Sequence, residues 1–167
     1  ITTLFLEIGT PKREAHEYAD IILEFETKVA EKAFTRVQMR DIEKMYNIYS
    51  PKTLESLTPL IKWPDFFKQK SIKQPDTLII GMVDYMKNLN WLFERAPLEN
   101  LKTYAKGRLL MESAPYLSRN FVDIHFRFRG KILSGTKQIK PNWQRAQATM
   151  NALIGDIVSQ QYVKKYF

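Results

Sequence analysis

The sequence predicts a mainly α-helical fold: a multi-helix, bundle-like lobe with long amphipathic helices and at most one short extended segment near residues 77–82. Apolar residues recur at steps of three and four along most of the chain, which is the period of a helix with one buried face. Six glycines and eight prolines in 167 residues leave little room for a many-turned β fold. The hydrophobic share of 44% is ordinary for a globular protein, and the length fits one domain with a real core. We therefore expect a single helical domain over residues 1–167.

The amino-terminal part is expected to contain one long helix. Residues 2–8 form a short apolar segment, and Thr10 and Pro11 then give a helix start signal, with Thr10 as the cap and Pro11 at the first helical position. The helix should run to about Ala33. Its predicted buried face consists of Ala15, Tyr18, Ile22, Phe25 and Val29.

Short pieces are expected to follow in the middle of the chain. An amphipathic stretch after Phe34 must end before Pro51, because the residue before a proline is pushed out of the helical region. Ser50 with Pro51 then restarts a helix. Three aromatic residues are expected to anchor this region on the core, namely Trp63, Phe66 and Phe67.

Residues 77–82 are the only good strand candidate. No second alternating run accompanies them, so a lone extended segment is expected rather than a sheet. Helices are expected next over residues 84–95 and 98–113, separated by Ala96 and Pro97.

The last third of the chain predicts two long helices that meet around residues 134–141. The upstream helix has an apolar stripe of Leu117, Phe121, Ile124, Phe128 and Ile132. The downstream helix has a stripe of Trp143, Ala146, Met150, Leu153 and Ile157. We expect the two stripes to face each other and to form the centre of the core.

The charge distribution is uneven, and cysteine is absent. Residues 1–60 carry a net charge of −2, whereas residues 61–167 carry +10. Such asymmetry fits a surface for nucleic acid or anionic lipid. It also fits the solvated exterior of a helical domain or a surface turned toward another part of the same protein. Without cysteine, neither a disulfide nor a thiolate metal site can form within the chain.

No apolar run approaches the roughly 20 residues of a membrane span, and no signal peptide is visible. Because the chain begins at Ile1 rather than Met, we expect a trimmed sequence from which any targeting segment has been removed.

The sequence assigns no catalytic residue and no metal ligand. His16 and Glu17 begin like the zinc-binding pattern His-Glu-x-x-His, but Asp20 stands where the second histidine belongs. These residues are expected on the exposed side of an acidic helix. His125 is expected to be partly buried and hydrogen-bonded locally. There is no glycine-rich phosphate loop and no G-x-S-x-G element.

Aromatic and basic residues alternate in the stretch HFRFRGK, residues 125–131. On a β surface this pattern could stack bases and hold phosphates. On a helix, consecutive residues point about 100° apart. Phe128 is therefore expected in the core, with Arg127 and Lys131 on another side, and no nucleic-acid partner is predicted.

Two strings of the sequence carry a family resemblance: RDIEKMYNIYSPKTLESLTPLIKW, residues 40–63, and NWQRAQATMNALIGDIVSQQYVKKYF, residues 142–167. They resemble the non-catalytic, amino-terminal region of the neprilysin and endothelin-converting enzyme family of zinc metallopeptidases, which includes bacterial endopeptidases. The resemblance covers the chain from about Tyr18 onward. The family-motif positions, expected to be structural, are Arg40, Tyr46, Asn47, Trp63, Trp143, Arg145, Gly155, Tyr162, Val163 and Phe167.

This resemblance implies a helical lobe that caps a zinc-bearing catalytic lobe and gates the access of peptide substrates to a cavity between the two. The zinc motif of the parent metalloendopeptidase would lie beyond Phe167, so this chain should be inactive alone and hold no cofactor. The implied partners are the catalytic lobe of the same polypeptide and peptides, with neither nucleic acid nor membrane contacted by this chain. The parent is expected outside the cytoplasm, in the periplasm, in the cell envelope or secreted.

Departures from the family pattern add further expectations. Ala146 stands where vertebrate members usually have cysteine, so the chain looks more like a bacterial member. The family's first segment is not visible, which predicts exposed apolar surface. Gly155 is expected to be buried against another helix. An alternative is a stand-alone helical binding module whose basic half docks an acidic partner.

Overall fold

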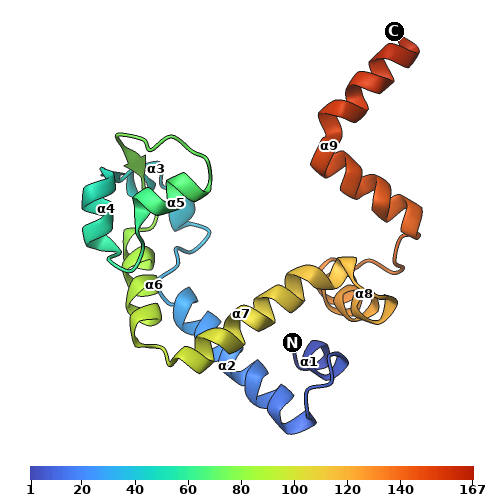
Figure 1. Cartoon of the computed structure of the whole chain (residues 1–167), viewed down its shortest axis with the longest axis horizontal. Coiled ribbons are helices and arrows are strands. Elements are labelled where there is room, and N and C mark those ends of the chain that lie inside the picture. Colours follow the sequence, from blue (N-terminus) through green and yellow to red (C-terminus); the bar gives the residue numbers. More distant parts are fainter. The chain divides into compact units, whose positions relative to one another are not determined.

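The computed structural model describes residues 1–167 and is predominantly helical, with one two-stranded sheet (Figure 1). The predicted mainly α fold class is thereby confirmed. The chain divides into two compact units, Ile1–Glu112 and Ser113–Phe167, which we call the first and the second unit. None of the helices combines the length and the hydropathy of a membrane-spanning segment.

Four helices build the core of the first unit: α1 (Thr2–Glu7), α2 (Lys12–Ala30), α6 (Val83–Arg95) and α7 (Leu98–Ser113). One apolar cluster centres on Phe5, Ala15 and Ile22 and includes side chains of α7. A second cluster centres on Phe25, Val29 and Leu92. The predicted buried face of the long amino-terminal helix is thus confirmed, with Tyr18 half-buried and its other four members buried.

The ends of the first two helices differ from the expectation. Residues 2–7 form a helix, because Leu4 and Phe5 on one side of it are buried. Gly9, with a φ of +84°, separates this helix from α2. Pro11 rather than Thr10 occupies the N-cap of α2, with an extended ψ of 143°, and no side chain caps the helix.

The middle of the first unit consists of short elements. They are η1 (Gln38–Arg40), α3 (Ile42–Met45), β1 (Ile48–Tyr49), α4 (Pro51–Leu57), α5 (Trp63–Gln69) and β2 (Leu78–Ile79). The prediction of a lone extended segment was wrong: β2 pairs antiparallel with β1. In this register Ile48 faces Ile79 and Tyr49 faces Leu78. The unexpected strand is β1, which is only two residues long and therefore has no alternating pattern that could predict it.

The predicted restart at Ser50 and Pro51 is confirmed by a complete capping box. The Ser50 hydroxyl accepts from the Thr53 backbone N–H, the Thr53 hydroxyl accepts from the Ser50 N–H, and Pro51 occupies the first turn. The helices predicted over residues 84–95 and 98–113 are confirmed as α6 and α7.

The second unit contains η2 (Ala114–Tyr116), α8 (Arg119–His125), the π-helical segment η3 (Phe126–Leu133) and α9 (Asn142–Tyr166). Its buried apolar residues are few, Ala114 and Val122. The expected core of two facing stripes was wrong, since Ile132 is 72% exposed and Leu153 is 78% exposed. Helical spacing identifies residues that share one apolar face of a helix. It does not identify the element that would pack against that face and bury it.

Phe128 was also expected in the core and is exposed. It lies in the π-helical segment η3, whose hydrogen bonds span five residues, so the α-helical period used to place it does not hold there. Phe126, at the start of this segment, packs its ring against Gly130 instead.

Helix α9 bends in its middle, as Figure 1 shows. Ile154 has the non-helical angles φ −133° and ψ 30°. The prediction that Gly155 is buried against another helix was wrong, because a Cβ built on Gly155 meets no atom within 4 Å. Gly155 comes directly after the bend residue Ile154 and makes no close contact with another helix.

Candidate functional site

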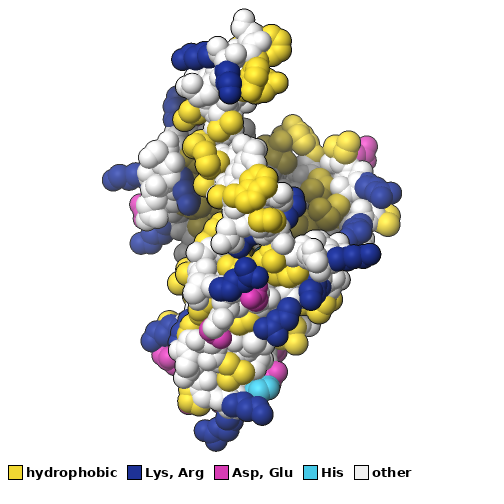
Figure 2. All heavy atoms as spheres, turned by 90° about the vertical axis from the view of Figure 1, so that its right-hand side faces the viewer, with side chains coloured by type: hydrophobic (Ala, Val, Ile, Leu, Met, Phe, Trp, Pro, Cys, Tyr) yellow, Lys and Arg dark blue, Asp and Glu magenta, His cyan; other side chains and the backbone are white.

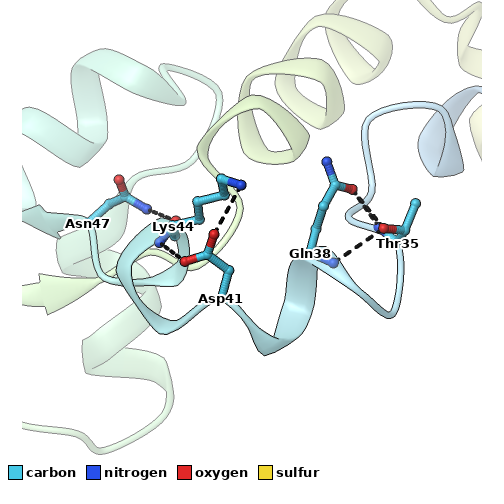
Figure 3. Close-up of polar contacts among 5 residues, drawn as sticks. All are labelled: Thr35, Gln38, Asp41, Lys44 and Asn47. Carbon is cyan, nitrogen blue, oxygen red and sulfur yellow. Dashed lines mark hydrogen bonds and ion pairs between the residues drawn. The ribbon is translucent and has the colours of Figure 1, made fainter.

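A chain of local polar contacts holds residues 35–47, around the motif positions Arg40, Tyr46 and Asn47 (Figure 3). The Gln38 side-chain oxygen accepts from the backbone N–H of Thr35 at 2.9 Å and from its hydroxyl at 3.0 Å. These contacts fix a segment too short to be held by helical hydrogen bonds alone. Arg40 and Tyr46 themselves are exposed.

Asp41 is the N-cap of α3. Its carboxylate accepts from the Lys44 backbone N–H at 3.3 Å and lies 3.0 Å from the Lys44 ammonium. The side-chain contact with Lys44, followed by the backbone hydrogen bond, holds the pKa of Asp41 below its usual value. The arrangement is a helix cap with an ion pair, which is structural chemistry.

Asn47 joins α3 to the sheet. Its side-chain amide donates to the Lys44 carbonyl at 2.8 Å and to the Ile80 carbonyl at 3.0 Å. Its own carbonyl accepts from the Ile80 backbone N–H at 2.9 Å. The side chain and the backbone carbonyl of Asn47 therefore both bind Ile80, 33 residues further along, and this pairing extends the very short sheet.

Trp63 anchors the aromatic cluster at the start of α5. Its indole N–H donates to the hydroxyl of the fully buried Thr58 at 2.9 Å, and that hydroxyl donates to the Leu54 carbonyl at 2.9 Å. The ring also contacts Phe66 and Phe67, with centroids 5.6 and 6.2 Å away. Phe67 is buried while Phe66 is 40% exposed, so the expected aromatic anchor rests mainly on Phe67.

Tyr104 and Glu26 link α7 to α2 inside the first unit. The tyrosine hydroxyl donates to the Glu26 carboxylate at 2.9 Å, and Arg108 donates to the same oxygen at 3.3 Å. Burial, together with the hydrogen bond to Glu26, raises the pKa of Tyr104 to about 12. Tyr104 is thus a neutral hydrogen-bond donor at ordinary pH. Sequence reasoning missed it and Thr58, because neither belongs to a recognisable motif.

Arg145 connects α9 to η2 within the second unit. Its guanidinium donates to the Pro115 carbonyl at 2.5 Å and to the Asn142 side-chain oxygen at 3.4 Å. Beside it lies an open groove of about 670 Å³, whose apolar lining includes Leu117 and Met150.

The other motif positions of α9 make no comparable contact inside the second unit. Trp143 is 65% exposed and Phe167 is 95% exposed. The Tyr162 ring lies 4.8 Å from that of Tyr166, one turn further along the same helix. Each unit thus holds its own group of motif positions: Arg40, Tyr46, Asn47 and Trp63 in the first, and Trp143, Arg145, Gly155, Tyr162, Val163 and Phe167 in the second.

The side chains do not fit a zinc ion. No group of three or more His, Cys, Asp or Glu residues converges anywhere in the chain. The imidazole Nδ1 of His16 lies 2.7 Å from the Lys12 carbonyl oxygen, one turn back on α2. A catalytic zinc site uses three protein ligands, and no such set is present among these residues.

Comparisons with known proteins give consistent matches. The sequence model described as Peptidase family M13 matches residues 1–167, including the first residues, where no resemblance was visible. Neprilysin-11 of Caenorhabditis elegans is 25% identical over 93% of this chain and 19% of its own length. Endothelin-converting enzyme 1 of Homo sapiens is 24% identical over 87% of this chain and 20% of its own length.

Solved structures match as well. The open state of the zinc metalloprotease of Mycobacterium tuberculosis is 28% identical, with a TM-score of 0.91 over 99% of this chain and 26% of that chain. The inhibitor complex of the same protease gives 27% identity and a TM-score of 0.87. The chain thus spans about a quarter or less of the length of these relatives.

Proposed function

Because the chain belongs to Peptidase family M13, as an amino-terminal region of its zinc metallopeptidases, we propose that it is the helical cap lobe of a zinc metalloendopeptidase. In this role it gates the access of peptide substrates to a catalytic lobe that lies outside residues 1–167. The catalytic lobe of the same polypeptide is then its principal partner.

The observation that carries this proposal is the likeness to the Mycobacterium tuberculosis zinc metalloprotease over 99% of the chain, at a TM-score of 0.91. The fold of that quarter of a peptidase is reproduced here without a set of metal ligands. A helical region with structural motif contacts and no ligand cluster suits a lobe that shapes access rather than one that performs hydrolysis.

Zinc is proposed for the parent enzyme and not for this chain. Bound by a His-Glu-x-x-His motif beyond Phe167, it would activate a water molecule for attack on a peptide carbonyl. The residues present here contribute the scaffold: Asn47, Trp63 and Arg145 hold short elements in place through the hydrogen bonds described above. By the same resemblance, the parent is proposed to act outside the cytoplasm.

The test measures zinc content and peptide cleavage for residues 1–167 and for the parent chain extended past Phe167. We expect stoichiometric zinc and cleavage only in the extended chain. Stoichiometric zinc with peptide cleavage by residues 1–167 alone would refute the proposal.

Gating is tested with a single substrate protein in two forms, folded and unfolded. The extended enzyme should cleave the unfolded form and short peptides, and it should leave the folded form intact. Equal cleavage of both forms would exclude a cap that limits access.

A stand-alone binding module remains the second candidate, because basic side chains line one groove of the second unit. Arg127, Lys131 and Lys137 surround a space of about 510 Å³, with Asp123 at its edge. This candidate predicts that residues 1–167 bind an acidic peptide with an affinity that falls steeply as salt is raised. No binding to poly-glutamate at physiological ionic strength would remove it.

A further inference from the structure

The bent helix α9 carries an apolar face that nothing in the second unit covers. We call Trp143, Met150, Leu153 and Ile157 the α9 stripe. These residues are 65%, 51%, 78% and 57% exposed. Trp143, Met150 and Leu153 are spaced by seven and three positions, so they lie in line along the part of the helix before the bend at Ile154, and Ile157 lies in the part after it.

Figure 2 shows hydrophobic side chains along the exposed surface of α9, in the upper part of the view. The groove beside Arg145 continues this surface, because Met150 also lines it together with Leu117 and Tyr116. The only buried apolar residues of the second unit are Ala114 and Val122, so the stripe is not part of its core. Contiguous exposed apolar surface of this kind marks an interaction site.

The spacing of the stripe defines the chemistry of its partner. Before the bend, the steps of seven and three between its members match the a and d positions of helices that pack side by side. The stripe contains no charged residue, so the facing surface must be apolar as well. The occupant that fits is an amphipathic helix with its own stripe of large aliphatic or aromatic side chains.

The lengths of the relatives indicate where this helix comes from. The chain accounts for 26% of the Mycobacterium tuberculosis zinc metalloprotease, so about three-quarters of that polypeptide lies outside the matched region. A segment of the same polypeptide is present at a far higher effective concentration than any separate partner. We propose that the α9 stripe docks an amphipathic helix of the parent chain that follows Phe167, an inference that rests on the proposed function.

The sharpest test is the labelling of single cysteines, which the cysteine-free sequence makes simple. The Leu153→Cys variant places the thiol in the stripe. The Ala152→Cys variant is the matched control, because Ala152 is exposed and turned about 200° from Met150 around the helix. Maleimide labelling is followed by mass spectrometry of the α9 peptide, both in residues 1–167 and in the parent chain.

In residues 1–167 both cysteines should react at similar rates. In the parent, the Leu153→Cys thiol should react at least about tenfold more slowly than the Ala152→Cys thiol, because labelling then requires the docked helix to open. Equal rates in the parent would overturn the proposal. A slow Leu153→Cys reaction already in residues 1–167 would also overturn it, because the cover would then lie within these residues or in a second copy of them.

Stability measurements provide an independent readout. The Leu153→Asp substitution should lower the melting temperature of the parent and leave that of residues 1–167 nearly unchanged. The Ala152→Asp substitution, with a similar loss of helix propensity, should have little effect on either. Equal effects of the two substitutions in the parent would contradict docking at the stripe.

The docking proposal and the proposed function can fail separately. A parent chain that binds zinc and cleaves peptides, with a freely reactive Leu153→Cys thiol, would retain the function and exclude the docking. A protected thiol in a parent without peptidase activity would retain the docking and exclude the function.

Discussion

Among single residues, Trp63 depends on a residue outside the family motif. The buried Thr58 hydroxyl accepts from the Trp63 indole and passes a hydrogen bond to the Leu54 carbonyl. Thr58→Val keeps the shape and removes both hydrogen bonds, leaving the half-buried indole N–H without its partner. We expect a loss of about 1–3 kcal/mol in the free energy of unfolding, measured by urea titration.

The control for this substitution is Ser56→Ala in α4, the helix for which Thr58 is the C-cap. Ser56 also donates to a backbone carbonyl one turn back, that of Lys52, but it is exposed. Its loss should change stability by no more than about 0.5 kcal/mol. If Thr58→Val were as mild as Ser56→Ala, the Trp63 hydrogen bond would have no structural importance.

A second residue-scale prediction concerns pH. Burial and Glu26 raise the pKa of Tyr104 from 10.0 to about 12, so folding favours its neutral phenol. The resulting stabilisation is fully present below pH 10 and is lost as the pH rises toward 12. Tyr104→Phe cannot ionise, so the stability of the wild type relative to this variant should decrease over that interval.

Urea unfolding at a series of pH values measures this difference, and the absorbance of the phenolate follows the ionisation directly. Tyr116→Phe removes an exposed tyrosine outside the cluster and controls for the loss of one phenol. A difference between wild type and Tyr104→Phe that stays constant from pH 10 to 12 would contradict the raised pKa.

At the scale of helices, two glycines predict opposite effects. A Cβ on Gly107 of α7 would collide with Ile22 of α2 and lie 3.6 Å from Phe5, and both neighbours are fully buried. Gly107→Ala should therefore destabilise the first unit by about 1–2 kcal/mol, because overpacking exceeds the gain in helix propensity. Gly155→Ala meets open space in α9 and should be neutral or stabilise by up to about 1 kcal/mol.

Thermal unfolding monitored by circular dichroism distinguishes the two. A stabilising Gly107→Ala would mean that α2 and α7 are less closely packed than the structure shows. A destabilising Gly155→Ala would mean that the bend at Ile154 requires a glycine.

The elements that could be predicted from the sequence are those whose packing partners lie within the same unit of the chain. The stripe of α2 was correct because its partners, α6 and α7, lie within the first unit. The strand Ile48–Tyr49 could not be predicted, since two residues carry no periodicity and Asn47 supplies part of the pairing. The π-helical turns of η3 had no sequence signal either, and Phe128 was therefore wrongly expected in the core.

The motif positions show the same limit. Family resemblance singled out Asn47, Trp63 and Arg145, and each has a hydrogen-bond role in the structure. It could not supply their partners Thr58 and Pro115, because a hydrogen bond to a buried hydroxyl or a backbone carbonyl constrains geometry more than residue type.

For the whole molecule, the distribution of buried residues predicts unequal stability. Nine of the buried apolar residues lie in the first unit, and only Ala114 and Val122 lie in the second. Amide hydrogens of α9 should exchange faster than those of α2 in residues 1–167, because fewer buried contacts resist local opening. Hydrogen–deuterium exchange with mass spectrometry measures both helices in one experiment, and equal protection would contradict two units of different stability.

The uncovered α9 stripe has a consequence for biosynthesis. A ribosome makes the chain from its amino end, so α9 emerges before any segment that follows it. The apolar side chains of the α9 stripe are then exposed to water. Two lysines, Lys164 and Lys165, stand at the end of the helix, and residues 61–167 carry a net charge of +10. Charge repulsion of this kind opposes self-association, and it would keep the nascent chain from aggregating until the helix proposed to cover the stripe is synthesised.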